Sequence, residues 1–194
     1  MILNSGLGIL GASQPKGISY VVGLTPSLIS IPAQNLAAWT LRSSDISAYI
    51  GATARVVVQY TSGSSFRGDI QLDDFNIGGN VFDPNVGLYS FQRNSVQGVV
   101  SNYSSVTWNA LLTGSNGAGL FFRDSSGTPS GSTGNTTGNT GSWYYYAETS
   151  GSGRNSIFWL RSGVVTLTQN TFSLYTAQNG TNCGAIEVYL DIIS

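Results

Sequence analysis

The chain has 194 residues, a formal net charge of −1, no histidine and a single cysteine, Cys183. The absence of histidine excludes Ser-His and Cys-His nucleophile pairs and imidazole metal sites. A lone cysteine excludes an intrachain disulfide, a zinc–thiolate cluster and a Cys-x-x-Cys redox pair. Eight basic residues against nine acidic ones give no basic surface of the kind that nucleic-acid binding requires. Composition therefore excludes most enzyme classes and nucleic-acid partners, but it does not assign a function.

Residues 1–35 are predicted to form an extended arm, and residues 36–194 a single domain. The arm contains Pro15, Pro26 and Pro32, which disfavour helices and central strands, and it has room for one strand over residues 18–23. Its apolar beginning lacks the basic segment of a secretory signal, so we expect none. No run of about 18 apolar residues occurs, and we therefore expect no membrane-spanning segment.

Strands are predicted along most of the domain, and no helix is. Residues 54–60 form a β-branched run, and residues 69–75 alternate, with Ile70 and Leu72 on one face and Gln71 and Asp73 on the other. Further strands are predicted over residues 88–92, 142–148, 156–161, 163–169, 171–177 and 185–193. Short strands at intervals of about 8–12 residues, separated by Gly, Ser and Asn, predict an all-β sandwich or barrel.

The longest predicted loop spans residues 124–141 and contains the sequence SSGTPSGSTGNTTGNTG. It carries almost no charge and no large apolar side chain, so we expect a solvated connection. The alternative is a contact with glycans or with a neighbouring subunit. Loops longer than about 12–15 residues are often functional, which keeps both interpretations open.

Two separate stretches resemble the MAM-type jelly-roll family. Residues 36–77, most clearly WTLRSSDISAYIGATARVVVQYTSGSSFRGDIQLDDFNI from Trp39 onward, resemble the closing half of that domain. Residues 119–191 resemble the opening half, through FFRDSSGTPSGSTGNTTGNTGSWYYYAETSG and the GAIEVYL strand near the end. Phe121 stands where the family usually has Trp, and the disulfide cysteines of animal members are missing. The inverted order implies a jelly-roll β-sandwich that is circularly permuted, or one that is completed by a neighbouring chain.

The resemblance also implies a cation site at one edge of the sandwich. The candidate ligands are Asp73, Asp74 and Glu148, and the expected ion is Ca²⁺, which takes six to eight oxygen ligands in irregular geometry. The alternative is that these carboxylates hydrogen-bond to the backbone or pair with Arg123 or Arg67.

Aromatic residues give a second candidate site. In the run from Trp143 to Tyr146, alternation places Trp143 and Tyr145 on one face, where their rings could stack on a sugar. One face of this strand must belong to the core, so packing is the favoured interpretation for at least half of these rings. Trp108 and Trp159 are predicted to anchor the core, and Cys183 is assigned no role.

One catalytic route remains open, because a glycoside hydrolase needs only two carboxylates. Glu148 and Glu187 are the only glutamates, but no paired motif surrounds them, and we expect a non-enzymatic protein. MAM-like jelly rolls of this kind occur in bacteriophage structural proteins. We therefore expect a virion component, either a capsid decoration protein or a tail-fibre component, that forms a homo-oligomer and contacts capsid or tail subunits. The alternative is a carbohydrate-binding or adhesion module that recognises host-surface glycans.

Overall fold

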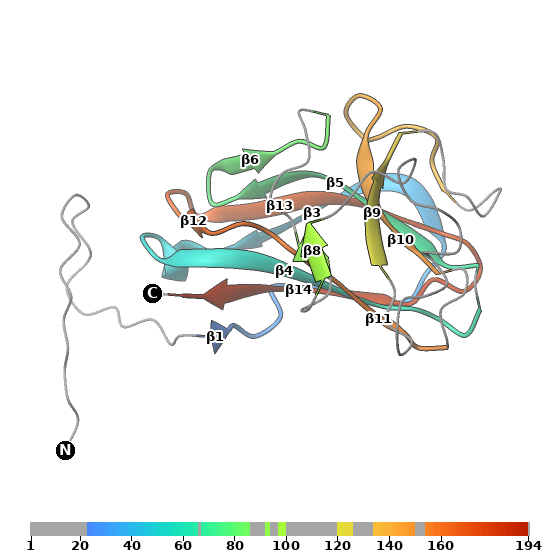
Figure 1. The fold of residues 1–194 in the computed structure, drawn as a ribbon. Helices are drawn as coiled ribbons and strands as arrows, with labels where there is room; N and C mark the ends of the chain where they lie inside the picture. The colour runs from blue at the N-terminus through green and yellow to red at the C-terminus, as the bar shows by residue number, and fades with distance from the viewer. Residues whose placement is uncertain are drawn as a thin grey trace, which may run out of the picture.

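The computed structural model describes residues 23–65, 67–85, 92–93, 97–99, 120–125, 134–149 and 154–193. These residues form two antiparallel sheets that pack face to face, with β4 and β14 in one layer and β5 and β13 in the other (Figure 1). The predicted all-β sandwich is therefore confirmed. No helix in the described part of the chain is long and apolar enough to span a membrane.

The first sheet, sheet I, has β14 and β4 at its centre. Its strands, in spatial order, are β1 (Gly23–Leu24), β14 (Ala185–Ile192), β4 (Thr53–Thr61), β11 (Ile157–Arg161), β7 (Gln92–Arg93) and β8 (Gln97–Val99). Two further short strands join it: β2 (Ile29–Ile31) pairs with β14, and β12 (Val165–Thr166) pairs with β4. Residues 23–31, which were predicted to belong to the extended arm of residues 1–35, thus add two short strands to the edge of sheet I.

The second sheet, sheet II, has β13 and β5 at its centre. Its order is β3 (Leu36–Asp45), β13 (Thr171–Asn179), β5 (Asp69–Ile77), β10 (Tyr144–Glu148) and β9 (Leu120–Asp124), and β6 (Asn80–Phe82) pairs with β5. A short 3-10 helix, η1 (Ser47–Tyr49), follows β3 and leads back to sheet I.

Alternating side chains from both sheets build the core. On β14 the residues Ile186, Val188, Leu190 and Ile192 are buried while those between them are partly exposed, as the sequence predicted. On β4 the inward side chains are Ala54, Val56, Val58 and Tyr60, and β11 adds Phe158 and Leu160. Sheet II contributes apolar side chains from β5, β13, β10 and β9, namely Ile70, Leu72, Phe75, Ile77, Phe172, Leu174, Tyr145, Ala147 and Phe121. Burial of this apolar surface is the main stabilising contribution to the fold.

A β-bulge in β5 interrupts its alternation. The register with β13 shifts between Ser173 and Tyr175, and Asp74 has a positive φ of 47°. A bulge adds one residue to a strand without a partner opposite it. Consequently Ile70 and Leu72 point into the core before the bulge, and Phe75 and Ile77 do so after it. Asp73 and Asp74 are the residues in between.

The outer face of sheet II is also buried. Phe122, Tyr144 and Tyr146 form a second apolar cluster there, and Trp39 packs against it. Residues 134–143 lie over this face and are tied to it by hydrogen bonds, for example from the Nε2 of Gln71 to the carbonyl of Asn135 (2.8 Å). Residues 134–141 are therefore fastened to sheet II, while Thr136, Thr137, Thr140 and Gly141 are exposed, so the predicted solvated connection also covers one face of the sheet. Uncharged polar residues cover this face through hydrogen bonds of their backbone and amide groups. A hydropathy pattern does not reveal contacts of this kind.

Several strands differ from their predicted extent. Residues 163–169 contain only the two-residue β12, and the sequence reasoning did not identify β2, β3, β6, β8 or β9 as strands. Trp159 lies partly exposed on β11 and is absent from the core, contrary to prediction, because it sits opposite the inward-facing set of that strand. Trp108, residues 1–22 and most of the predicted strand over residues 88–92 lie outside the described residues.

Candidate functional site

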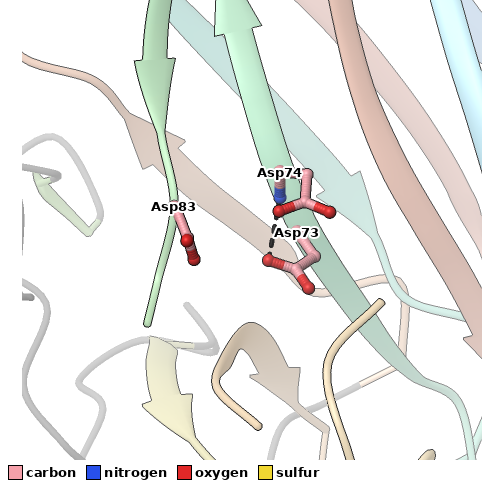
Figure 2. A group of neighbouring side chains, drawn as sticks. All are labelled: Asp73, Asp74 and Asp83. Carbon is pink, nitrogen blue, oxygen red and sulfur yellow. Dashed lines mark hydrogen bonds between the residues drawn. The ribbon is translucent and has the colours of Figure 1, made fainter. Parts of the chain in front are cut away.

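Three carboxylates converge at the bulge of β5. One carboxylate oxygen each from Asp73, Asp74 and Asp83 lies within 4.8 Å of the others. Figure 2 shows Asp73 and Asp74 projecting from β5 and Asp83 projecting from the segment that follows β6. The bulge explains why two consecutive aspartates meet at one place, since neighbouring side chains of a regular strand point to opposite faces. We call these three residues the aspartate cluster.

Residues 134–143 are fastened to the aspartate cluster. Oδ2 of Asp73 accepts hydrogen bonds from the backbone N–H groups of Asn139 (2.7 Å) and Thr140 (3.3 Å), and its Oδ1 accepts one from the N–H of Asp74 (2.8 Å). Oδ2 of Asp74 accepts from the Asn139 amide (2.8 Å) and the Thr140 hydroxyl (2.6 Å). The cluster therefore acts as the anchor of the segment that covers sheet II.

Asn85 connects the third aspartate to the same segment. Its N–H and its amide both donate to Oδ1 of Asp83 at 2.7 Å, and the amide also donates to the carbonyl of Thr140 (2.6 Å). Its Oδ1 accepts from the N–H groups of Ser142 (2.8 Å) and Trp143 (2.9 Å). Asn85 thus bridges the segment after β6 and the segment that leads into β10.

Burial dominates the electrostatics of the cluster. Asp73 is fully buried, and this burial, followed by the charge of Asp74, raises the pKa of Asp73 to about 7, although the three N–H donors act in the opposite direction. Arg123 lies nearby: its Nε donates to the carbonyl of Pro84 (2.7 Å), and its guanidinium carbon stands 3.8 Å from the centre of the Trp143 ring. Burial lowers the pKa of Arg123, while the neighbouring Asp83 charge opposes that shift.

Chemically, the cluster can bind a proton or a hard cation. Carboxylate oxygens are the ligands that Ca²⁺ takes. Among the described residues, hydrogen bonds are directed at both oxygens of Asp73, at Oδ2 of Asp74 and at Oδ1 of Asp83. Oδ1 of Asp74 and Oδ2 of Asp83 are the carboxylate oxygens that remain for a cation. Asp73 is therefore better placed to fix the covering segment than to act as a metal ligand.

The predicted ligand Glu148 does not join the cluster. In the pairing of β10 with β5, Ala147 lies opposite Ile70, and Tyr145 lies opposite Leu72. Glu148 is therefore about four residues along the sheet from Asp73, a separation of about 13 Å at about 3.3 Å per residue. The grouping of Asp73, Asp74 and Glu148 is wrong, because the antiparallel register carries Glu148 to the opposite end of β10.

Asp83 is the residue that sequence reasoning missed. It stands in the sequence Asp83-Pro84-Asn85, directly after β6, and its side chain caps the N–H of Asn85. An Asp-Pro-Asn sequence is a turn signal. The hairpin from β5 to β6 returns the chain to the bulge, and the close pairing of Phe75 with Phe82 brings Asp83 beside Asp74.

The two sugar-stacking candidates, Trp143 and Tyr145, lie in different environments. Tyr145 is fully buried in the core, where its ring meets the edge of Phe75 at a centroid distance of 6.1 Å, so it offers no face to a sugar. Trp143 is partly exposed, but the Arg123 guanidinium covers one side of its indole ring. At most one face of Trp143 is therefore available to a ligand.

The two glutamates also lie far apart. Glu148 follows the inward-facing Ala147 and therefore belongs to the outer side of sheet II, whereas Glu187 stands between the inward-facing Ile186 and Val188 on the outer side of sheet I. Packed sheets are about 10 Å apart, so the two carboxyl groups exceed the 5–9.5 Å separation that a glycosidase pair needs. The carboxylate of Glu187 instead accepts hydrogen bonds from the hydroxyls of Ser27 and Ser30. The geometry therefore contradicts the catalytic pairing of Glu148 with Glu187.

Another group of aromatic and polar side chains lies on the outer face of sheet I. The register places Glu187, Gln59 and Trp159 side by side in one row across β14, β4 and β11, and Tyr189, Val57 and Arg161 in the adjacent row. All of these except Val57 are partly exposed. An aromatic ring beside an amide and a guanidinium provides both an apolar surface and directed hydrogen-bond donors.

Comparisons with protein-family models, with curated proteins and with solved structures find no match for this chain. The MAM-like resemblance, with its two halves in inverted order, stays a prediction from the sequence.

Proposed function

We propose that this chain is a non-enzymatic structural protein of a bacteriophage virion that acts through contacts between protein subunits. The observation that supports the proposal is the way in which residues 23–31 join the domain. They run along β14 as the short strands β1 and β2, so an extended segment adds to the edge of a sheet. Strand addition of this kind also operates between chains, where main-chain hydrogen bonds supply affinity.

Backbone and side-chain contacts hold residues 23–31 in place. The N–H of Thr25 donates to the carbonyl of Leu190 (2.8 Å), and the N–H of Leu28 donates to that of Val188 (2.7 Å). Ser30 donates to the carboxylate of Glu187 (2.6 Å), and Ile31 is buried in the core. Residues 23–31 are therefore part of the domain, so the deletion that tests the proposal is confined to residues 1–22, which lie outside the described residues.

The contacts of residues 23–31 determine which residues the deletion experiment removes. A variant lacking residues 1–22 is expected to fold but to lose incorporation into particles, which is measured by its content in gradient-purified virions relative to the intact chain. A variant lacking residues 1–35 also loses Ile31 and exposes the edge of β14, so it is the control for damage to the fold. Absence of the intact chain from purified virions would contradict the proposal, as would full incorporation of the variant without residues 1–22.

The outer face of sheet I favours a second candidate function, which is carbohydrate binding. Trp159 offers an indole ring beside Gln59 and Arg161, the combination of flat apolar surface and polar groups that suits a sugar. The chain is expected to bind immobilised glycans in a saturable way, and Trp159→Ala should abolish binding, whereas Trp143→Ala should retain it. Equal loss in both variants, or no binding by the intact chain, would reject this site.

A further inference from the structure

Two aromatic side chains define a diagonal across the outer face of sheet I. Trp159 on β11 stands in one row of that face, and Tyr189 on β14 stands in the adjacent row. Both residues are partly exposed. Two strand spacings of about 4.8 Å and two residues of about 3.3 Å separate their positions, which gives about 12 Å along the sheet. A single pyranose ring is shorter than this span, so a ligand that stacks on both aromatic rings must be a chain of sugars.

Polar side chains of opposite character flank this diagonal. Arg161 shares β11 with Trp159 and lies on one side of the diagonal. Glu187 shares β14 with Tyr189 and lies on the other side. The Glu187 carboxylate already accepts hydrogen bonds from two serine hydroxyls, but a carboxylate has about four lone-pair sites, so it can accept more. A guanidinium only donates and a carboxylate only accepts, whereas a hydroxyl does both. Sugar hydroxyls along the diagonal therefore have a partner on either side.

The charges of the described side chains on this face balance. Arg161 and Glu187 have opposite signs, and in the next row Arg55 lies directly opposite Asp191. A ligand of either sign would meet as much repulsion as attraction. Electrostatic complementarity therefore favours an uncharged ligand.

The distribution of apolar side chains favours a sugar over a protein partner. The exposed aliphatic residues Ile157 and Leu24 lie at the margins of the face, the first beside Thr61 and the second beside Asp191. Protein–protein interfaces have the reverse arrangement, with an apolar centre and a polar rim. A face with aromatic and polar groups at its centre instead suits a ligand that combines flat apolar surfaces with many hydroxyls.

We propose that the outer face of sheet I binds an uncharged linear oligosaccharide, with one sugar stacked on Trp159 and another on Tyr189. The hydroxyls between these two sugars bond to Arg161 on one side and to Glu187 on the other. Gln59, in the row of Trp159, adds an amide that both donates and accepts. The inference rests on the carbohydrate-binding function proposed above and adds to it a second aromatic platform, a minimum ligand length and the absence of ligand charge.

Chain length tests the two platforms. The probes are uncharged, unbranched oligomers of glucose, of mannose and of N-acetylglucosamine, from one to six units, titrated into the intact chain by calorimetry. The affinity should rise about ten-fold from monomer to tetramer, and Tyr189→Ala should remove this rise while it leaves the affinity for the monomer unchanged. Tyr189→Phe keeps the ring and should keep the rise. Tyr175→Ala is the matched control, since it removes a partly exposed tyrosine from the other sheet.

The outcomes separate this inference from the carbohydrate-binding function itself. If none of the probes binds, both are rejected. If a probe binds through Trp159 with an affinity that is independent of chain length, or if Tyr189→Ala behaves like the intact chain, only the present inference is overturned. Self-association of the intact chain that Trp159→Ala abolishes would identify this face as a protein interface and would also overturn it.

Salt and an acidic probe test the absence of ligand charge. The affinity for the best uncharged oligomer should change by less than about two-fold between 0.05 and 0.5 M NaCl, because no net charge is screened. A galacturonic acid oligomer of the same length should bind more weakly than the uncharged one. Tighter binding of the acidic oligomer, lost at high salt, would overturn the assignment to an uncharged sugar. Incorporation into virions enters neither titration, so its failure would concern only the proposed structural role.

Discussion

At Asp73, burial and hydrogen bonding act on the same carboxyl group in opposite directions. Three backbone N–H groups favour its charged form, whereas full burial and the adjacent Asp74 disfavour it, and the latter effects prevail with a pKa of about 7. An ordinary aspartate has a pKa near 4. The charge state of one residue therefore changes within the neutral range, at the point where residues 134–143 are anchored.

The raised pKa of Asp73 predicts a specific dependence of stability on pH. Because the pKa of about 7 in the folded chain exceeds that of the unfolded chain, the folded state binds an additional proton between about pH 4 and 7. The stabilising contribution is thus present in full below about pH 4 and is lost as the pH rises through 7. Between pH 5 and 8 the free energy of unfolding should fall by about 2–3 kcal/mol relative to Asp73→Asn, as measured by urea denaturation.

The control for this measurement is Asp191→Asn on β14, which should retain the pH dependence of the intact chain because it leaves the aspartate cluster unchanged. If Asp73→Asn and the intact chain lose stability equally between pH 5 and 8, Asp73 does not titrate in this range.

Binding of the expected Ca²⁺ to the aspartate cluster can also be tested. At pH 8 the carboxylates of the aspartate cluster repel one another, and a bound cation should offset that repulsion. Millimolar Ca²⁺ is expected to raise the thermal midpoint, and removal of the ion with a chelator should reverse the effect. Asp83→Asn should abolish the increase, whereas Glu148→Gln should preserve it, because Glu148 lies about 13 Å along the sheet. If Ca²⁺ leaves the thermal midpoint unchanged, the aspartate cluster binds a proton and does not bind this cation.

At the scale of elements, residues 134–143 act as a cover for the outer face of sheet II, and Gln71 is its central attachment. Gln71 is fully buried; it donates to the carbonyl of Asn135 and accepts from the N–H of Asn135 at 2.6 Å. Gln71→Ala removes both partners and should destabilise the chain by about 1–3 kcal/mol. Ser43→Ala on the exposed face of β3 is the control and should change stability by less than about 0.5 kcal/mol.

Hydrogen exchange measures the local effect of the same substitution. The amides of Asn139 and Thr140, which donate to Asp73, should exchange faster in Gln71→Ala than in the intact chain. Amides at the centre of β4 should change their exchange rate only as far as the change in the global free energy of unfolding requires. Unchanged stability and unchanged exchange at these amides would show that the cover does not depend on Gln71.

The strands that the sequence predicts well are those with an alternating or β-branched apolar pattern. The predicted ends of β14, β4 and β5 lie within two residues of the actual ends, although β5 is buried on both faces over most of its length. β3 was missed because it buries no side chain, so it has no hydrophobic period, and only its backbone ladder with β13 defines it. Two of the three cluster residues, Asp73 and Asp74, were named in advance, because the resemblance to the MAM-type family implies a cation site there. Asp83 and the buried outer face depend on a hairpin and on amide hydrogen bonds, which leave no periodic signal.

At the scale of the whole molecule, the ends of the described chain lie side by side. Gly23 of β1 is paired with Ile192 of β14, so a linker of a few residues can join the two ends. This proximity is the condition for circular permutation, which the sequence resemblance to the MAM-type family predicts. The fold should therefore tolerate a change in the order of its halves.

A permuted chain tests this directly. Residues 1–22 are removed, residue 193 is joined to Gly23 by a short Gly/Ser linker, and new ends are opened within residues 101–119, between the two halves. The permutant should give the circular dichroism spectrum and the cooperative urea transition of a chain lacking only residues 1–22, because every strand pairing among the described residues is kept. New ends opened inside β4, the central strand that pairs with β14 and β11, should abolish folding and serve as the control. If opening within residues 101–119 is as damaging as opening β4, the order of the halves is essential and the chain does not behave as a permuted jelly roll.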